Sequence, residues 1–204
     1  MIQSVKIIAF ILLWTGLTLS PALANKQTGA APQTTVEQLL DAIQKIKIEN
    51  DKGKAQNASE HTPHALSKLN MEWISAKALG KYWDQRTEVE QKEFTELLSQ
   101  LFVHVAFPNS GKFFAELKIH YGKTTLNKDR AIVPMKVVHT EEGEVGIDFH
   151  LRTTDKGEWK IVDVDLDEVS MRNNLRNQFY KILAKDGYPD LIRRMTEKLQ
   201  ESKG

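Results

Sequence analysis

The sequence predicts an α+β fold, in which a curved, four-stranded antiparallel sheet carries helices from both ends of the chain on one face. Three observations support this prediction. Apolar residues recur at intervals of three and four between residues 34 and 105, which is the spacing of helix faces. Between residues 117 and 166 they alternate with polar residues, as in strands. Helical spacing returns after residue 170.

The N-terminal residues have the pattern of a cleavable signal peptide. Lys6 precedes an apolar stretch at 7–19, which is short for a helix that must cross about 30 Å of hydrocarbon. An A-x-A cleavage pattern follows at 22–24. We therefore expect the protein to be exported. The expected parts are a signal peptide, a polar linker and one domain, at residues 1–24, 25–33 and 34–204.

Composition and charge exclude several classes of protein. The 28 Lys and Arg residues against 27 Asp and Glu residues leave a net charge of +1, which does not favour nucleic acid as a partner. The chain has no cysteine, which removes disulfides, thiolate metal sites and cysteine nucleophiles. Its mean hydropathy of −0.42 excludes a polytopic membrane protein. We expect a monomer without a metal or other cofactor.

Three helices are expected before the sheet. The first begins at Thr34 and Glu37, which have the spacing of a capping box, and the third begins with the same pattern at Thr87 and Glu90. The polar stretch at 50–63 between the first two is expected to be a loop. The second and third helices are expected at about 70–83 and 87–105.

Proline, glycine and serine residues mark the end of the third helix and the bounds of two helices after the sheet. Pro108 and Gly111 are expected to end the third helix. Ser170 is expected to cap a helix that ends at Gly187. Pro189 then stands at the start of a last helix, whose apolar stripe ends at Leu199.

Four strands joined by short turns predict an antiparallel meander. Both faces of the second strand carry apolar residues, which predicts cover on both sides for part of its length, and Pro134 within it predicts an edge or a bulge. In the fourth strand the apolar phase slips at Ile161 and Val162, which predicts a bulge. The expected strands are 117–121, 131–138, 145–152 and 159–166.

Histidine and carboxylate side chains provide the candidates for acid–base or metal chemistry. His120, Asp148 and His150 lie on the polar sides of predicted strands, where they form either a general acid–base group or a polar cross-strand contact. His61 and His64 lie three residues apart in a predicted loop, without a third ligand nearby in the sequence.

Three aspartates alternate along the last strand. Asp163, Asp165 and Asp167 lack the glycine and the bidentate glutamate of a calcium-binding loop. They are therefore expected to form a solvated face.

The apolar faces of the sheet and helices all require burial. Either they bury one another in a core, or they enclose a cavity that an apolar ligand fills, and periodicity does not distinguish the two. The candidate cavity residues lie on the third helix and on the inner face of the sheet: Phe94, Leu98, Leu101, Phe102, Val105, Val133, Met135, Val137, Ile147, Phe149 and Leu151.

Several motifs, in their order and spacing, resemble those of one family. Residues 78–83 (ALGKYW), with Thr87, Gln91 and Phe94 after them, are similar to the "ALGxxW…T…Q…F" segment of the MlaC family, also called the toluene-tolerance family of periplasmic lipid-binding proteins. Residues 159–164 (WKIVDV) look like its "WKVYDV". Residues 174–179 (NLRNQF) look like its "NYRxQF". Residues 167–170 (DEVS) replace its "EGVS", without the glycine.

The resemblance implies a fold like that of nuclear transport factor 2 and a lipid-binding domain at 34–204. It implies no catalysis. A phospholipid would be carried as cargo in the periplasm of a Gram-negative bacterium, with its acyl tails inside the protein. The implied partners are an inner-membrane ABC transporter with an MCE-domain subunit and an outer-membrane lipoprotein complex, in a pathway that maintains outer-membrane lipid asymmetry.

Three other interpretations stay open at this stage. One is a carrier of hopanoids or other apolar ligands from the same family. Another is an exported enzyme of the same cone-shaped fold that uses His120, Asp148 and His150. The last is an adaptor that binds only proteins.

Overall fold

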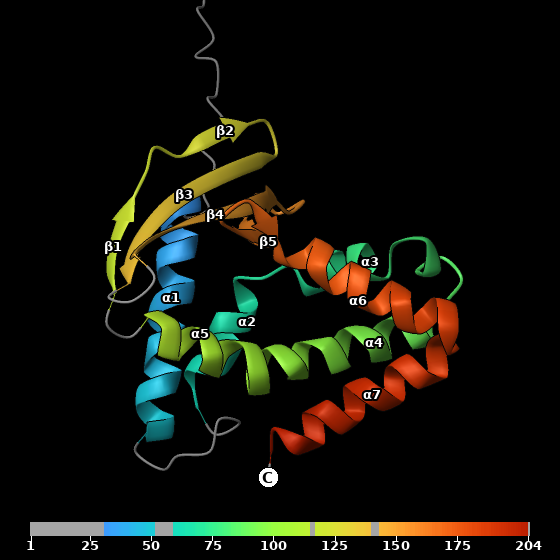
Figure 1. Ribbon diagram of the computed structural model, residues 1–204. Coiled ribbons are helices and arrows are strands. Elements are labelled where there is room, and N and C mark those ends of the chain that lie inside the picture. The colour runs from blue at the N-terminus through green and yellow to red at the C-terminus, as the bar shows by residue number, and fades with distance from the viewer. Residues whose placement is uncertain (1–30, 52–58, 115–116, 140–142, 204) are drawn as a thin grey trace, which may run out of the picture.

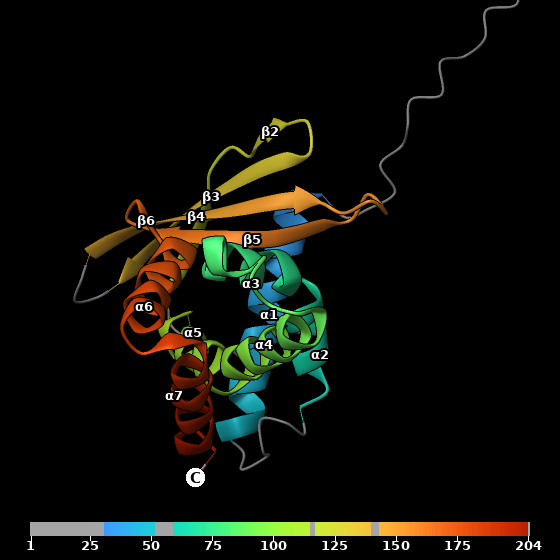
Figure 2. The same ribbon diagram turned by 90° about the vertical axis from the view of Figure 1, so that its right-hand side faces the viewer.

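The computed structural model describes residues 31–51, 59–114, 117–139 and 143–203, so the predicted signal peptide and most of the predicted linker lie outside the described residues. The fold is α+β. Strands form one antiparallel layer, and the helices lie against one face of it (Figures 1 and 2). This arrangement confirms the predicted fold class.

The helices are α1 (Pro32–Asp51), α2 (His61–Ser67), α3 (Met71–Leu79), α4 (Glu88–Leu101), α5 (Phe107–Phe114), α6 (Met171–Lys185) and α7 (Gly187–Glu201). A 3₁₀ turn, η2 (Gly80–Tyr82), follows α3, and a π-helical segment, η3 (Phe102–Ala106), joins α4 to α5. The strands are β1 (Lys118–Tyr121), β2 (Thr125–Asn127), β3 (Arg130–His139), β4 (Gly143–Thr153), β5 (Trp159–Leu166) and β6 (Val169–Ser170).

The first helix starts earlier than its predicted capping box. The amide of Thr35 donates to the carbonyl of Ala31 at 3.1 Å, and Pro32 occupies the first helical position. Proline suits that position because its fixed φ is helical and its missing N–H has no partner there. The capping box predicted at Thr34 and Glu37 is therefore wrong, because both residues lie inside the helix.

His61 and His64 are helical. The loop predicted at 50–63 is wrong at its end, because α2 begins at His61 and contains both histidines. The imidazole of His61 lies 3.8 Å from the carboxylate of Glu60. Among the residues that the structure describes, no group of three or more His, Cys, Asp or Glu side chains is placed to hold a metal ion.

The predicted capping box of the long helix is confirmed. The hydroxyl of Thr87 accepts from the amide of Glu90, and the Glu90 carboxylate accepts from the amide of Thr87. The predicted end at Pro108 is wrong, since helical structure continues to Phe114. Pro108 is the second residue of α5, and the amide of Phe107 before it bonds to the carbonyl of Phe102, five residues back, so the missing N–H of proline interrupts no regular ladder.

The sheet has six strands rather than four. Its order is β1-β3-β4-β5-β6, with β2 also paired to β3, and all pairs are antiparallel. The four predicted strands are confirmed. The additional strands, β2 and β6, have three and two residues, which is too short to show alternation in the sequence.

Pro134 lies where one side of β3 has no strand partner. The β1 ladder pairs with residues 135–138 of β3, and the β2 ladder pairs with residues 130–132, so Pro134 falls between them. Its carbonyl accepts from the amide of Gly122 at 2.8 Å. Because a ladder donor is not needed there, proline is tolerated, as the predicted edge position required.

The outer face of β3 is not covered in the described structure. Ile132 and Val138 remain 36% and 46% exposed, so the predicted cover on both sides is wrong. The predicted bulge in β5 is confirmed, because Leu151 pairs with Ile161 and His150 with Asp163, which leaves Val162 as the extra residue. The bulge buries both Ile161 and Val162.

The core lies between the sheet and the long first helix. The predicted stripe of α1 is buried, and burying each such side chain contributes about 1.5–3 kcal/mol. Gly111 on α5 allows the two helices to approach closely, because a Cβ there would lie 3.1 Å from the Cβ of Lys47. The buried α1 residues are Val36, Leu39, Leu40, Ile43 and Ile46.

A strained turn joins β5 to β6. Asp167 and Glu168 have φ angles of 44° and 67°, a region that favours glycine. The turn is held by β4, since the amide and the carboxylate of Asp167 bond to the backbone of Gly146, each at 2.9 Å.

We expect Glu168→Gly to raise the free energy of unfolding by about 1 kcal/mol, because it removes the cost of a left-handed conformation at a residue with a Cβ. Urea denaturation measures the change. Asp155→Gly is the control, since Asp155 lies in the β4–β5 turn and its φ is not positive. An unchanged or lower stability of the Glu168 variant would contradict the prediction.

Candidate ligand cavity

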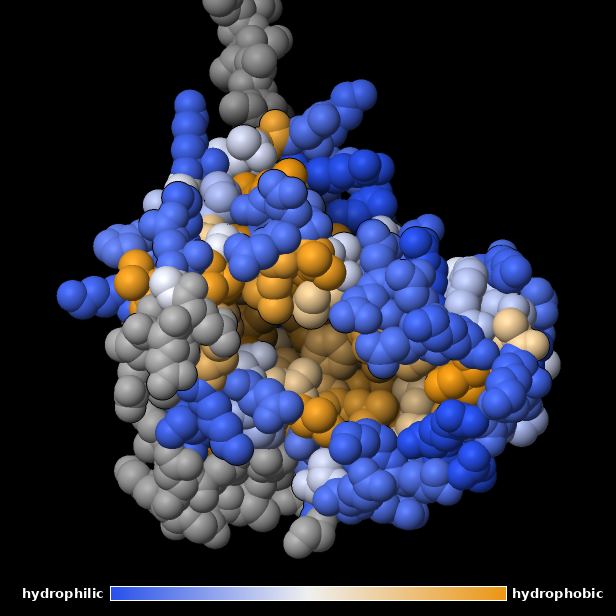
Figure 3. Space-filling view, viewed as in Figure 1, coloured by the Kyte–Doolittle hydropathy of each residue, from blue (hydrophilic) through white to orange (hydrophobic). Residues whose placement is uncertain are grey.

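A cavity of about 870 Å³ lies between the sheet and the helices. Figure 3 shows it as an apolar hollow that opens to the outside, with hydrophilic residues around its rim. Its walls come from α1, α3, α4, η3, α5, β4, β5, α6 and α7. The volume lies within the range of small-molecule sites, about 300–1,000 Å³.

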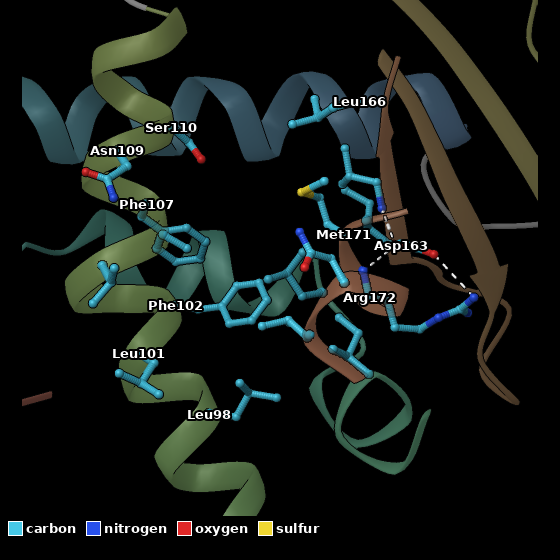
Figure 4. A pocket seen from close by; sticks show the side chains of 18 of the residues that line it. Leu98, Leu101, Phe102, Phe107, Asn109, Ser110, Asp163, Leu166, Met171 and Arg172 are labelled. Atoms are coloured by element: carbon cyan, nitrogen blue, oxygen red, sulfur yellow. Dashed lines mark hydrogen bonds and ion pairs between the residues drawn. The ribbon is translucent and has the colours of Figure 1, made fainter. Parts of the chain in front are cut away.

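Five of the candidate cavity residues line this cavity. They are Leu98 and Leu101 on α4, Phe102 and Val105 on η3, and Phe149 on β4. Figure 4 shows Leu98, Leu101 and Phe102 together on one side of the cavity.

The other six candidates lie in the packed core and are at most 1% exposed: Phe94, Val133, Met135, Val137, Ile147 and Leu151. Phe94 packs edge-to-face on Phe179, with their ring centroids 5.8 Å apart. The sheet residues belong to the core cluster that includes α1, and α1 contacts both β3 and β5. The space over that part of the sheet is therefore filled by protein side chains and does not belong to the cavity.

Sequence reasoning missed the contributions of α1, α5, α6 and α7. Ile43 on α1, Phe113 on α5, Leu175 on α6 and Met195 on α7 all line the cavity. Their apolar stripes are visible in the sequence, but a stripe does not tell whether it faces another helix or an open space.

The π-helical segment η3 forms part of the wall. Phe102, Val105 and Ala106 line the cavity, whereas Val103 and His104 are buried on the other side. Burial lowers the pKa of His104, and the nearby charge of Lys203 lowers it further.

We expect His104 to make the protein less stable as the pH falls below about 6.5, the ordinary histidine value. The unfolded chain then binds a proton that the folded chain resists, so the stability contributed at higher pH is lost. Urea unfolding at pH 7.5 and 5.5 measures the loss, which should be smaller in His104→Gln. The exposed His120→Gln variant should behave as the wild type, and an equal effect of the two variants would contradict the prediction.

Asp163 anchors α6 beside the cavity. Its carboxylate accepts from the hydroxyl of Ser170 at 2.6 Å and from the amide of Arg172 at 3.0 Å, and the guanidinium of Arg172 lies 3.3 Å away. Ser170 in turn accepts from the amide of Asn173, which confirms the predicted cap. Asp163 is only 8% exposed, so the prediction that it lies on a solvated face is wrong. The bulge at Val162 brings it there.

Two of the cationic groups that line the cavity are held by carboxylates. The Arg172 guanidinium, bound to Asp163, also lies 5.0 Å from the centre of the Trp73 ring. Arg194 on α7 bonds to Asp190 at 2.6 Å and to Asp186 at 2.9 Å. Lys198 is the third, and its ammonium group lies 3.3 Å from the carboxylate of Glu201.

The structure does not bring together the proposed acid–base residues. His120 is in register with Lys136 and His150 with Ile132, and these two positions are about 13 Å apart along β3 at ~3.3 Å per residue. The ring of His150 bonds to Asp165 at 2.9 Å rather than to Asp148. None of these residues lines the cavity.

Comparison with known families identifies the chain. Residues 33–197 match the family described as "MlaC protein". The chain belongs to the MlaC family. A solved structure of similar fold, with a TM-score of 0.71 and 19% sequence identity, is that of a phospholipid-binding protein from Ralstonia solanacearum in complex with a phospholipid. The match covers 86% of this chain and 100% of that chain. No curated protein matches the sequence.

The structure gives physical reasons for the motif residues of this MlaC-family chain. Gly80 has a φ of 49°, and a Cβ there would lie 2.3 Å from the hydroxyl of Tyr180 on α6. That hydroxyl accepts from the amide of Lys81 at 2.9 Å, so the 78–83 motif fixes the contact between η2 and α6.

Within the described residues, no helix has the length and apolar character needed to cross a bilayer.

Proposed function

We propose that the protein is a phospholipid carrier of the periplasm and catalyses no reaction. It takes up a phospholipid with the acyl tails in the cavity and the headgroup at the rim. It exchanges this lipid with an inner-membrane ABC transporter that has an MCE-domain subunit, and with an outer-membrane lipoprotein complex. In this way it supports the lipid asymmetry of the outer membrane.

The open apolar cavity of about 870 Å³ is the observation that carries the proposal. Leu98 and Leu101 line it on one helix, and Leu175 and Ile182 line it on another. Each methylene group that leaves water gains about 0.8 kcal/mol, so acyl tails are the ligand that such walls favour. Membership of the MlaC family and the phospholipid bound to the Ralstonia solanacearum protein point to the same ligand.

The signal-peptide pattern at residues 1–24 supports export, and export supports a role between the two membranes. Fractionation of cells that express the full chain tests this part. We expect the mature protein in the periplasmic fraction, with its N-terminus at Asn25.

Native mass spectrometry of the purified mature protein, followed by lipid extraction, tests the cargo. We expect one phospholipid per protein. A hopanoid or another lipid without a phosphate in its place would overturn the proposed cargo. A protein that stays empty after incubation with phospholipid vesicles would overturn the carrier function itself.

A further inference from the structure

We infer that Lys198 on α7 binds the phosphate group of the lipid headgroup. This inference rests on the proposed function, because it assigns a contact to the lipid whose tails occupy the cavity. It follows from a comparison of the cationic side chains that line the cavity in the described part of the chain, Arg172, Arg194 and Lys198.

The charge of Arg172 is already paired within the fold. Its partner Asp163 has a side chain that is 6% exposed, and the guanidinium also stacks on Trp73. Removing a charge from such a buried pair leaves the other charge without a partner, which is strongly unfavourable. A lipid phosphate would have to compete with this carboxylate.

The charge of Arg194 is also paired within the fold. Its Nε donates to Asp190 at 2.6 Å and one of its terminal nitrogens donates to Asp186 at 2.9 Å. The carboxylate side chains are 21% and 28% exposed. Arg193 shares Asp190 and also binds Glu197, so three carboxylates surround two guanidinium groups and leave no excess positive charge for a phosphate.

Lys198 differs from both arginines. Its side chain is 60% exposed, and its partner Glu201, 3.3 Å away, is 68% exposed. Exposed pairs of this kind contribute little to stability, so the ammonium group can leave Glu201 at small cost. The aliphatic stem of a lysine packs along apolar surface while its charge stays in water. At the cavity wall, this arrangement places a stem beside the acyl tails and a cation at the rim.

Uncharged polar side chains also line the cavity, on α5 and, as Asn174 and Gln178, on α6. Asn109 and Ser110 on α5 line the cavity and carry uncharged donors, and Figure 4 shows both on the α5 side of it. A charge-assisted hydrogen bond to phosphate is roughly twice as strong as one between neutral groups. Lys198 is therefore the side chain that we expect to distinguish a phospholipid from a neutral lipid.

The test compares phosphatidylglycerol with a diacylglycerol of the same acyl chains, both presented in neutral vesicles, by binding to the full mature protein. The wild type should prefer the phospholipid. Lys198→Met keeps an apolar stem and removes the charge, so this preference should fall about tenfold, the size of one charge-assisted hydrogen bond. Lys198→Arg should retain it. Lys181→Met is the matched control, since Lys181 on α6 is exposed and does not line the cavity.

Three results would overturn the inference. In the first, Lys198→Met keeps the full preference for the phospholipid. In the second, it loses both lipids equally, which would mean that the side chain only packs. In the third, inorganic phosphate alone binds at Lys198 and displaces the lipid, which would make the site one for free phosphate. If the wild type binds neither lipid, the proposed function fails, and the inference fails with it.

Discussion

Val105→Trp should reduce phospholipid binding at least tenfold and leave the protein folded. Val105 lies on η3, is half-buried and lines the cavity. An indole there occupies space that the acyl tails need. The side chain faces an open cavity rather than a packed core, so the substitution avoids most of the usual cost of overpacking, about 1–3 kcal/mol.

The matched control is Val89→Trp on α4. Val89 is 66% exposed and does not line the cavity, so the same change of side chain there should leave binding unchanged. Quantification of the bound phospholipid by mass spectrometry, with thermal unfolding of both variants, gives the result. If Val105→Trp still binds lipid with wild-type affinity, the cavity near η3 does not hold the acyl tails.

The sequence predicts most of the fold because its periods are regular. The capping box of Thr87 and Glu90, the cap at Ser170 and the bulge at Val162 each follow from local chemistry. Local chemistry also misleads in two places. Thr34 and Glu37 have the spacing of a cap inside a helix that Pro32 already begins, and Pro108 follows a π segment that no periodicity reveals.

The cavity is harder to predict than the fold, for a physical reason. Val133 on β3 and Phe149 on β4 have the same inward phase, yet only Phe149 lines the cavity. Alternation tells which face of a strand a side chain occupies. It does not tell whether α1 or an open space lies opposite, because that depends on where distant helices pack.

The role of Asp163 illustrates the same limit. Alternation in a regular strand places Asp163 with Asp165 and Asp167 on a solvated face. The structure buries it, because the bulge shifts the register and the chain then returns through β6 to the first turn of α6. Asp163 contacts Ser170 and Arg172, which follow it by seven and nine residues, across a strand of two residues. Such contacts leave no periodic signal in the sequence.

Asp163→Ala should lower the free energy of unfolding by about 3 kcal/mol, the lower end of the cost of breaking a buried charge pair. The substitution removes the acceptor for Ser170 and for the amide of Arg172, and it leaves the Arg172 guanidinium without its carboxylate. Since α6 supplies a wall of the cavity, we also expect less bound phospholipid. Urea denaturation at neutral pH and lipid quantification measure the two effects.

Two further variants separate the anchor from a general effect of removing an aspartate. Asp148→Ala, on the neighbouring strand β4, removes a half-buried carboxylate that does not line the cavity, so its stability should change by less than about 0.5 kcal/mol. Ser170→Ala removes the helix cap and the hydroxyl that donates to Asp163 but keeps the contacts of Asp163 with Arg172, and it should cost about 1 kcal/mol. If Asp163→Ala costs no more than Ser170→Ala, the carboxylate does not anchor α6 beyond the cap, and the wall of the cavity is held in place by apolar packing.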